Sequence, residues 1–354
     1  MVTVGILGST GSIGRQTLDV IRANPDLFSV SFLSGSKNVE LLERQALEFN
    51  VKNISFAGSD LQQNGDFYAN TDIVVNGIGG IAGLKPTLAA IRAGVKRLAT
   101  ANKESLIAFS DIIKREVKKY GTEIIPVDSE HSAVFRLLQG EKAENIKKLI
   151  ITASGGAFRD KTKEELRSVT AKAALNHPTW KMGEKVTVDS ATLMNKAFEI
   201  VEASVLFETQ NIDAVIERQS LVHAMVELCD GSVKMHVSAP DMRLPIQYAL
   251  TYPNACACLP PTDLRNVRFE EIDAERFPCV RFGYEVKNDI KQGVVLVAAD
   301  DVAVEKYKTG AIGFYGVYDL VKRALGEFDA PEFDDEDSLL EYYRFIKNKI
   351  DTEY

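Results

Sequence analysis

The sequence predicts an α/β protein with an N-terminal doubly wound parallel sheet, then an α+β region and a helical C-terminal region. Two observations predict this. Apolar, strand-like runs alternate with segments of helical spacing from residue 2 to residue 128, and the first run leads into a glycine-rich turn. Repeated strand and helix units of this length form a parallel sheet that is covered on both faces. A chain of 354 residues is long enough for two or three domains.

The first strand and its glycine turn predict a nucleotide-binding site of Rossmann-like type. Residues 2–7 form an apolar run, the turn reads Gly8-Ser9-Thr10-Gly11-Ser12-Ile13-Gly14, and residues 15–22 have helical spacing. Glycine lets the backbone approach a pyrophosphate, which the helix N-terminus then attracts. The spacing G-x-x-G-x-x-G is a variant of the commoner dinucleotide motif, and by itself it also fits a tight turn that binds nothing. Its place at the first strand of an alternating pattern favours the nucleotide site.

The second strand, residues 28–33, predicts which dinucleotide is bound. It leads into Ser34-Gly35-Ser36-Lys37-Asn38. Enzymes that use NAD tend to carry an acidic residue here for the ribose 2'-hydroxyl, whereas a cationic residue accommodates the 2'-phosphate of NADP. This stretch has no acid and has a serine and a lysine, so we expect NADP(H).

The alternation continues to residue 128 and places polar residues after two strands. The expected helices are 39–49, 84–93 and 109–120, and the expected strands are 53–57, 72–76, 96–101 and a last strand that ends at Asp128. Ligands in such folds bind beyond the carboxyl ends of the strands. Asn102-Lys103-Glu104 follows one strand, and Asp128-Ser129-Glu130 ends another. A lysine such as Lys103 is more often a solvated surface residue, but beside a nucleotide and a metal it could bind substrate.

Asp128 and Glu130 are candidates for a metal site. Alternate side chains of a strand project to the same side, so these two acids are expected to lie together. Two neighbouring carboxylates raise each other's pKa unless a cation lies between them, and a divalent metal would supply that cation. A solvated strand end that carries surface acids is the open alternative.

The region after residue 149 predicts a lid and a phosphate site. A strand ends in Ser154-Gly155-Gly156, and residues 157–183 are polar and irregular, with the only tryptophan, Trp180, close to His177. Long connections of this kind are usually lids or binding loops, although Trp180 could instead anchor the loop to the core. In the next motif Asp189 or Ser190 makes a good helix N-cap, and Asn195 and Glu199 share a helical face beside Lys196.

Charged hydrogen bonds would dominate phosphate binding at this motif. Each contributes roughly 1.5–3 kcal/mol, whereas a helix dipole contributes about 0.3–1 kcal/mol. Ser154, Ser190, Asn195 and Lys196 could therefore hold a phosphate. An ordinary solvated helix face with a Lys and Glu pair is the alternative.

The remaining chain predicts a hairpin, a linker and helices. Strands at 220–228 and 232–237 flank Asp230-Gly231, where His223 and His236 are expected to be packing or solvated residues rather than ligands. A helix is expected at 244–250, and from residue 288 the pattern is helical, with an acidic break at 327–337. The expected domains are 1–128, which binds the nucleotide; 129–250, which carries the metal, substrate and lid near 157–183; a linker at 251–287, rich in proline; and the helical 288–354.

Composition and charge exclude some classes of partner. The chain has 42 Lys and Arg against 50 Asp and Glu, a net charge of -8, so long-range attraction to nucleic acid or an anionic membrane is not expected. No leader segment and no run of about 18 apolar residues is found, which predicts a cytoplasmic protein. The four cysteines include one C-x-C pair, Cys256 and Cys258, and no C-x-x-C, which favours reduced thiols over a zinc or redox site.

Taken in order, these motifs resemble the 1-deoxy-D-xylulose 5-phosphate reductoisomerase family. The resemblance covers about residues 1–250, with a weaker match to the helical end. It rests on the glycine turn, residues 101–105, 126–132, 153–156, 177–180 and 189–199, and Pro240-Asp241-Met242-Arg243. It implies isomerisation of the sugar phosphate followed by reduction with NADPH, giving 2-C-methyl-D-erythritol 4-phosphate, in a homodimer whose 129–250 domain mediates dimerisation.

The resemblance also implies the roles of individual residues. Asp128, Glu130 and Glu199 would ligate Mg2+ or Mn2+, in keeping with the preference of hard cations for carboxylate oxygen. Together with Lys103 they form the implied catalytic set. The implied substrate-binding residues are Ser129, Glu130, Ser154, His177, Trp180, Met182, Ser190, Asn195, Lys196 and Glu199. The implied NADPH-binding residues are Gly8, Ser9, Thr10, Gly11, Ser12, Ile13, Gly35, Ser36, Lys37, Asn38, Asn102, Glu104, Gly183 and Met242.

The chain departs from the family pattern in two places. It has Glu217-Arg218-Gln219-Ser220 where the family commonly has His-Pro-Gln-Ser, and Val297-Ala298-Ala299-Asp300-Asp301 where the family has Asn-Ala-Ala-Asn-Glu. An NADP-dependent dehydrogenase without the isomerase step is the runner-up, and it would not need three metal carboxylates. A nucleotide-sensing regulator would need a DNA-binding module and a basic face, neither of which the sequence shows.

Overall fold

The computed structural model describes residues 1–56, 65–176, 179–180, 182–260, 262–263 and 267–353. The chain packs into two compact units. The first comprises Met1–Ser105, Ile113–Arg136 and Asp241–Pro261, and the second comprises Leu106–Ile112, Leu137–Pro240 and Thr262–Tyr354. Residues 241–261 thus pack with the first unit, whereas the sequence grouped 241–250 with the region that starts at residue 129.

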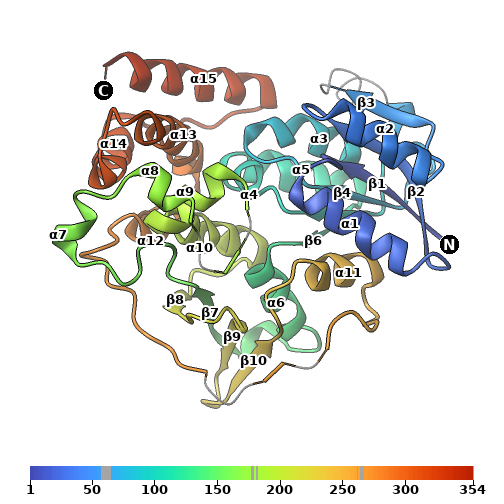
Figure 1. The fold of residues 1–354 in the computed structure, drawn as a ribbon, viewed down its shortest axis with the longest axis horizontal. Coiled ribbons are helices and arrows are strands. Elements are labelled where there is room, and N and C mark those ends of the chain that lie inside the picture. The colour runs from blue at the N-terminus through green and yellow to red at the C-terminus, as the bar shows by residue number, and fades with distance from the viewer. Residues whose placement is uncertain (57–64, 177–178, 181, 261, 264–266, 354) are drawn as a thin grey trace. The chain divides into compact units, whose positions relative to one another are not determined.

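The first unit contains a six-stranded parallel sheet, as the sequence predicts (Figure 1). Its strands are β1 (Val2–Leu7), β2 (Phe28–Gly35), β3 (Asn53–Phe56), β4 (Ile73–Asn76), β5 (Arg97–Thr100) and β6 (Glu123–Pro126). The strand order is β3-β2-β1-β4-β5-β6, so the order reverses at β1. In this arrangement ligands bind beyond the carboxyl ends of β1 and β4, where the glycine turn begins.

Helices cover both faces of such a sheet. Right-handed crossovers put the helices on one side of the strand-order reversal on one face, and the helices on the other side of it on the opposite face. The helices of this unit include α1 (Ser12–Ala23), α2 (Val39–Glu48), α3 (Leu84–Arg92) and α11 (Arg243–Thr251). The main core of this unit joins the sheet to α1, α2 and α11 through buried side chains such as Ile6, Leu18, Leu42 and Ile246. Each buried aliphatic side chain of this size contributes roughly 1.5–3 kcal/mol.

Arg97 anchors α11 to the sheet. Its guanidinium donates to the carbonyls of Ala249 (3.1 Å) and Tyr252 (3.0 Å) and pairs with Glu123. The same group lies over the Tyr252 ring. These contacts explain why a segment more than 140 residues from β5 in the chain belongs to this unit.

The second unit contains a mixed sheet of four strands in the order β10-β9-β7-β8. They are β7 (Ile146–Ala153), β8 (Ile212–Ile216), β9 (Val222–Leu228) and β10 (Val233–Val237). Strand β7 pairs parallel with β8 and antiparallel with β9. The β9–β10 hairpin around Asp230-Gly231 is confirmed. Strand β8 lies in a stretch for which the sequence predicted no element.

Helices make up most of the rest of the second unit, and the helical C-terminal region is confirmed (Figure 1). Helix α13 packs against both α14 and α15, and α10 packs against α9 and α12. Their bounds are α7 (Lys163–Leu166), α8 (Ala171–Ala174), α9 (Glu184–Thr192), α10 (Met194–Phe207), α12 (Val280–Val286), α13 (Gly293–Thr309), α14 (Phe314–Glu327) and α15 (Glu336–Glu353). Within the described residues, no helix combines the length and the apolar character that a membrane span requires.

The boundaries between the two units fall within three helices, so part of each helix is assigned to each unit. They are α4 (Lys103–Ala108), α5 (Ser110–Tyr120) and α6 (Ser129–Leu137). The expected single helix at 109–120 is therefore preceded by a further short helix, which begins at Lys103.

Some local expectations are wrong, for identifiable reasons. Strand β6 ends at Pro126 and α6 begins at Ser129, so Asp128 and Glu130 do not alternate along a strand. Proline has no N–H for the sheet, and an Asp-Ser-Glu sequence is a typical helix start. Asp189 and Ser190 lie inside α9 and do not cap a helix, because the break comes at Leu193, which has a φ of 59°. The expected linker contains α12, where Val280 and Phe282 are buried.

Candidate active site

The glycine turn after β1 has the backbone geometry of a phosphate cradle. Gly8 has a φ of 79°, and the N–H of Gly11 donates to the Gly8 carbonyl at 3.0 Å. A Cβ on Gly14 would lie 2.4 Å from the Gly8 carbonyl oxygen, so only glycine lets α1 pack this closely on the turn. Gly11 is the N-cap of α1 and offers no side chain to the helix end. The backbone at this helix N-terminus suits a bound phosphate.

The loop after β2 lies beside this turn. A Cβ on Gly35 would lie 3.3 Å from the side chain of Thr10, and the Ser9 N–H donates to the Ser34 carbonyl at 2.7 Å. Lys37 and Ser36 are exposed next to this contact. The structure thus brings together the two stretches that the sequence assigned to one nucleotide.

Three of the expected cofactor residues also have internal roles. The buried Ser9 hydroxyl donates to Gln45 at 2.8 Å, and the Asn38 side chain accepts from the Leu41 N–H and caps α2. The Asn102 amide donates to the carbonyls of Ile78 (2.6 Å) and Gly80 (2.7 Å). Asn102 therefore shapes the loop that follows β4.

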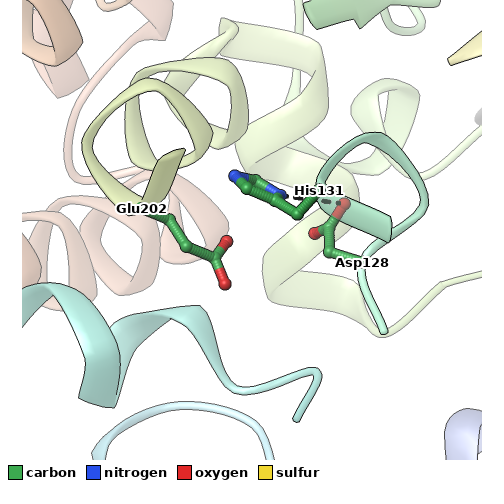
Figure 2. Close-up of side chains that lie close together, drawn as sticks. All are labelled: Asp128, His131 and Glu202. Carbon is green, nitrogen blue, oxygen red and sulfur yellow. Dashed lines mark ion pairs between the residues drawn. The ribbon is translucent and has the colours of Figure 1, made fainter. Parts of the chain in front are cut away.

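Asp128 is held by two basic groups within the first unit. The Lys103 ammonium lies 2.5 Å from one carboxylate oxygen, and His131 Nδ1 lies 3.7 Å from the other. Figure 2 shows Asp128 and His131, which lie on either side of the start of α6; Glu202, drawn with them, belongs to the second unit. Burial would raise the pKa of Asp128, but Lys103 and then His131 outweigh burial and hold this pKa well below its ordinary value. The carboxylate is therefore ionised, as a metal ligand must be.

Two glutamates also follow these strands: Glu104 lies after β5, and Glu130 lies after β6. The Ser129 hydroxyl donates to Glu130 at 2.5 Å, and both residues are half-buried at the start of α6. Lys103 and Glu104 are buried, at 7% and 5% exposure. Lys103 is thus not the solvated surface lysine that the sequence left open.

In the second unit, α10 gathers the expected polar residues at the end of β7. Lys196 is buried, pairs with Glu199 and donates to the Thr152 carbonyl. Asn195 donates to Glu199. The shared helical face predicted for these residues is confirmed, and it is buried against the strand end instead of being solvated.

The loop that follows Ser154 makes a tight backbone contact with Ser190. Gly156 has a φ of 69°, and a Cβ there would lie 2.4 Å from the Ser190 carbonyl oxygen. The loop after β7 therefore packs directly on α9. Ser154, Ser190, Asn195 and Lys196 thus all come from segments that meet at the carboxyl end of β7.

The expected lid is only partly described. His177 lies outside the described residues. Trp180 is half-buried, and its ring centroid lies 6.4 Å from that of His223 on β9; His223 lies 6.1 Å from His236 on β10. Met182 is half-buried, and Gly183 is exposed as the N-cap of α9. Within 157–183 the short helices α7 and α8 replace part of the expected irregular loop.

Met242 belongs to the first unit, where it precedes α11 and packs against the main core. This position follows from the anchoring of α11 by Arg97. The sequence pattern did not predict that Met242 packs with the first unit, because Arg97, which holds α11, is far from Met242 in the chain.

The departure at Glu217 has a structural reason. Its buried carboxylate accepts from the backbone N–H groups of Gln219 (2.9 Å), Leu221 (2.6 Å) and Val222 (3.1 Å) and so orders the turn before β9. Arg218 pairs with Asp160 and Glu270. Glu217 and Arg218 thus hold this turn through their own contacts.

Sequence reasoning gave no site role to His131, Arg159 or Lys185. Arg159 donates to the carbonyls of Ser154 (2.9 Å) and Arg218 (3.0 Å) and so supports the loop after β7. Lys185 faces Asp189 and Asp300. Two spacings offered a usable sequence signal: His131 lies three residues after Asp128 at a helix start, and Lys185 lies four residues before Asp189.

Comparison with known proteins gives one consistent result. Models described as 1-deoxy-D-xylulose 5-phosphate reductoisomerase match residues 4–66 and 58–110, its C-terminal domain matches 124–207, and a DXP reductoisomerase C-terminal domain matches 237–349. A 1-deoxy-D-xylulose 5-phosphate reductoisomerase of Geobacillus sp. (strain WCH70) is 42% identical and covers 96% of each chain. That of Bacillus subtilis (strain 168) is 44% identical over 92% of each.

Solved structures agree. A crystal structure of DOX-P reductoisomerase in complex with NADPH, fosmidomycin and magnesium has a TM-score of 0.90 and 33% identity, covering 99% of this chain and 97% of that one. The enzyme from Zymomonas mobilis in complex with NADPH has a TM-score of 0.87 and 33% identity, covering 99% and 98%.

Proposed function

The chain belongs to the 1-deoxy-D-xylulose 5-phosphate reductoisomerase family, and we propose that Asp128, Glu130 and Glu199 are the ligands of its catalytic metal. The protein catalyses the NADPH- and metal-dependent conversion of 1-deoxy-D-xylulose 5-phosphate to 2-C-methyl-D-erythritol 4-phosphate. The observation that carries the assignment is the likeness over the whole chain to an enzyme solved with NADPH, fosmidomycin and magnesium.

The proposed ligands suit a hard divalent cation. All three are carboxylates, the donors that Mg2+ and Mn2+ prefer over imidazole or thiolate. Asp128 is held ionised by Lys103 and His131, and Glu199 is paired with Lys196. The magnesium in the related structure favours Mg2+, and Mn2+, with the same ligand preference, is the alternative.

The proposed NADPH site occupies the carboxyl ends of β1 and β2. Glycines at 8, 11 and 14 leave the backbone open to the pyrophosphate, and Lys37 would pair with the 2'-phosphate. The further residues proposed for this site are Ser9, Thr10, Ser12, Ile13, Gly35, Ser36, Asn38, Asn102, Glu104, Gly183 and Met242. Ser9 and Asn102 can contribute through their backbone, since their side chains bind within the protein.

The substrate phosphate is proposed to bind where the loop after β7 meets α9 and α10. Lys196 supplies a buried positive charge, and Ser154, Ser190 and Asn195 supply hydrogen-bonding groups. His177 completes the proposed set, although it lies outside the described residues. A phosphate needs such local contacts because the net charge of the chain is -8.

The chain's own residues orient the reacting part of the substrate. When bound, the metal is a Lewis acid that stabilises negative charge on substrate oxygens, and NADPH supplies the hydride. Lys103, fixed by Asp128, can donate a hydrogen bond to a substrate oxygen, and the Ser129 hydroxyl, which donates to Glu130, can accept one from a substrate hydroxyl. Trp180 and Met182, from the proposed lid, would exclude water while the carbon skeleton rearranges.

A homodimer is proposed through the second unit. Among the described strands, β10 is at one end of its sheet, and its Val233 and Met235 are 52% and 43% exposed. Exposed apolar side chains on an edge strand suit a protein contact. A cytoplasmic location is also proposed, since all four cysteines are free thiols, as in a reducing compartment.

The metal assignment is tested by Glu199→Gln. The amide keeps the shape of the side chain and removes its charge, so Mg2+-dependent turnover should fall at least about 100-fold. The affinity for NADPH, measured by fluorescence titration, should stay within about two-fold, because every residue of the proposed nucleotide site except Gly183 is in the first unit. Glu305→Gln, an exposed glutamate on α13, is the matched control and should keep full turnover. Unchanged turnover of Glu199→Gln at limiting Mg2+ would remove Glu199 from the metal site.

A further inference from the structure

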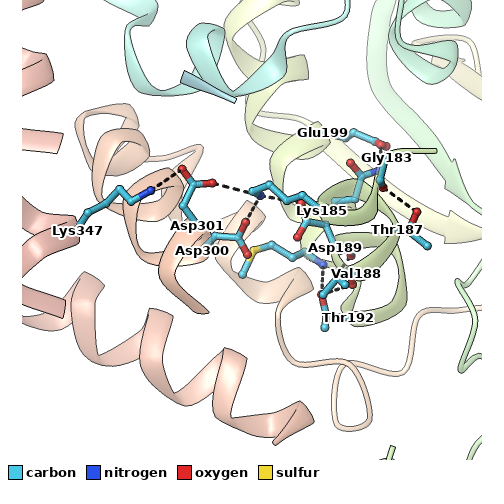
Figure 3. Close-up of polar contacts among 12 residues, drawn as sticks. Gly183, Lys185, Thr187, Val188, Asp189, Thr192, Glu199, Asp300, Asp301 and Lys347 are labelled. Carbon is cyan, nitrogen blue, oxygen red and sulfur yellow. Dashed lines mark hydrogen bonds and ion pairs between the residues drawn. The ribbon is translucent and has the colours of Figure 1, made fainter. Parts of the chain in front are cut away.

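Lys185 is the centre of a charged cluster in the second unit. It lies in the first turn of α9, and its ammonium is 2.8 Å from Asp189 and 3.7 Å from Asp301, with Asp300 in direct contact (Figure 3). The side chains of Asp189 and Asp300 are 3% and 0% exposed, and that of Lys185 is 26% exposed. This lysine therefore compensates negative charge on two buried carboxylates at once.

The cluster continues from α13 to α15. Asp301 accepts from the Tyr343 hydroxyl and lies 3.6 Å from the Lys347 ammonium. Asp300 and Asp301 are the acids that stand where the family pattern has asparagine and glutamate. One continuous set of contacts thus joins the start of α9 to α13 and α15.

Lys185 also touches the neighbours of two proposed site residues. Its ammonium lies 5.1 Å from the centroid of the Phe198 ring, and Phe198 directly precedes Glu199 on α10. Asp189, its partner on α9, directly precedes Ser190. One cation therefore contacts both helices that carry the proposed phosphate and metal groups of this unit.

The negative charge of this cluster reaches the buried thiol of Cys279, at the start of α12. Burial is the main cause that raises the pKa of Cys279 well above its ordinary value, and the carboxylates of Asp300 and Asp189 raise it further. Lys185 contacts both of these carboxylates. Its loss would remove a positive charge from between two buried carboxylates, and their repulsion would favour a larger separation of α9 and α13, the helices that carry them.

We propose that Lys185, through Asp189, Asp300 and Phe198, is a positioning residue that sets the relative placement of α9 and α10 and so aligns Ser190 with Lys196 and Glu199. This inference rests on the proposed function, which assigns those three residues to substrate and metal. In this proposal Lys185 acts through its neighbours and does not contact the substrate, the metal or NADPH. The network with Asp301, Tyr343 and Lys347 makes the C-terminal helices part of the support of the site.

The test is Lys185→Met, which keeps the length of the side chain and removes its charge. Misplacement of a binding group by about 1 Å can cost up to about 100-fold. We therefore expect the KM for 1-deoxy-D-xylulose 5-phosphate to rise about 10-fold or more and the Kd for Mg2+, measured by calorimetry without substrate, to rise in parallel. The KM for NADPH should change less than that for the substrate, because every residue of the proposed nucleotide site except Gly183 is in the first unit. Lys185→Arg should recover most of the substrate KM.

Lys291→Met is the matched control, because Lys291 forms an exposed pair with Glu332 in the same unit, outside the cluster. It should leave all three constants unchanged. A Lys185→Met protein with a lower Tm but an unchanged substrate KM and Mg2+ affinity would overturn the proposal, since the cluster would then only stabilise the fold.

Asp301→Asn covers the case in which Lys185→Met does not fold. It keeps Lys185 and both buried partners and should raise the substrate KM in the same direction by a smaller factor; no change would overturn the proposal. Ser190→Ala and Glu199→Gln distinguish a failure of the proposed site from a failure of the proposed positioning role. If they leave substrate and metal binding unchanged, the proposed site is wrong, whereas if they act and Lys185→Met does not, the positioning role is wrong.

Discussion

At the scale of single residues, two of the proposed metal ligands are each paired with a lysine. Lys103 pairs with Asp128 in the first unit, and Lys196 pairs with Glu199 in the second. Both pairs are largely buried, and a buried carboxylate without a partner would cost several kcal/mol. Each lysine therefore compensates the charge of its carboxylate, and both lysines are themselves proposed to bind substrate.

Lys103→Gln tests how much the first pair stabilises the protein. Breaking a buried pair leaves an uncompensated charge, so we expect the free energy of unfolding to fall by about 3 kcal/mol in the presence of a chelator. Urea titration followed by circular dichroism measures it. Lys96→Gln is the control: Lys96 is 81% exposed beside Asp72, and the loss of an exposed pair should cost less than about 1 kcal/mol. Equal losses in the two variants would contradict the argument.

Lys37→Ala tests the choice of dinucleotide. Lys37 is exposed beside the glycine turn, where a cation would pair with the 2'-phosphate of NADPH. Removing one charged hydrogen bond, worth roughly 1.5–3 kcal/mol, should lower the preference for NADPH over NADH by at least about 10-fold. The ratio of kcat/KM for the two nucleotides measures it. A ratio that stays constant would show that Lys37 does not recognise the phosphate.

At the scale of elements, side chains at strand ends join neighbouring strands of the first sheet. Asp72, just before β4, accepts from the N–H (3.0 Å) and hydroxyl (2.7 Å) of Thr3 on β1 and pairs with Lys96 before β5. The Lys96 hydrogen bond, followed by those from Thr3, lowers the pKa of Asp72 far below its ordinary value. One carboxylate thus connects three adjacent strands.

Asp72→Asn should make the stability of the protein less dependent on pH in acid. A carboxyl group whose pKa is depressed in the folded state stabilises the fold above its ordinary pKa of about 4, and this contribution is lost as the pH falls below that value. The variant should be less stable by about 1–2 kcal/mol at pH 7, and the difference from the parent should shrink between about pH 5 and pH 2. Thermal unfolding across that range measures it. A difference that is constant with pH would refute the linkage.

At the scale of the whole molecule, each unit brings together residues from distant parts of the chain. The first unit recruits residues 241–261 through Arg97, and the second joins α9 to α13 and α15 through Lys185. The proposed dimer would add a third level, by covering the apolar side chains of β10.

Met235→Lys tests that dimer. A charged side chain in the centre of an apolar contact loses the burial of the methionine and adds a desolvation cost. The variant should shift from dimer to monomer at micromolar concentration, as measured by sedimentation velocity. Glu227→Lys is unsuitable as a control because Glu227 pairs with Lys147, so Glu208→Lys, outside the sheet, serves instead. A parent chain that sediments as a monomer would contradict the dimer itself.

Prediction from the sequence was strongest where pattern and local chemistry agree. The alternation of apolar runs predicted six strands in a parallel sheet. The glycine-rich sequence predicted a tight turn at the end of β1. The cluster of Asn195, Lys196 and Glu199 followed from helical spacing. Local errors arose where two signals compete: Asp128 and Glu130 were assigned to a strand because apolar residues precede them, although Pro126 ends that strand.

Motif order and periodicity, which are properties of the local chain, were sufficient to identify the family and the parallel sheet. Only the folded structure shows that Gly156 meets Ser190, that Arg97 holds α11, and that Lys185 pairs with Asp300. These contacts join residues up to 152 positions apart. No local pattern encodes them, since burial and charge compensation exist only once the helices and strands have packed.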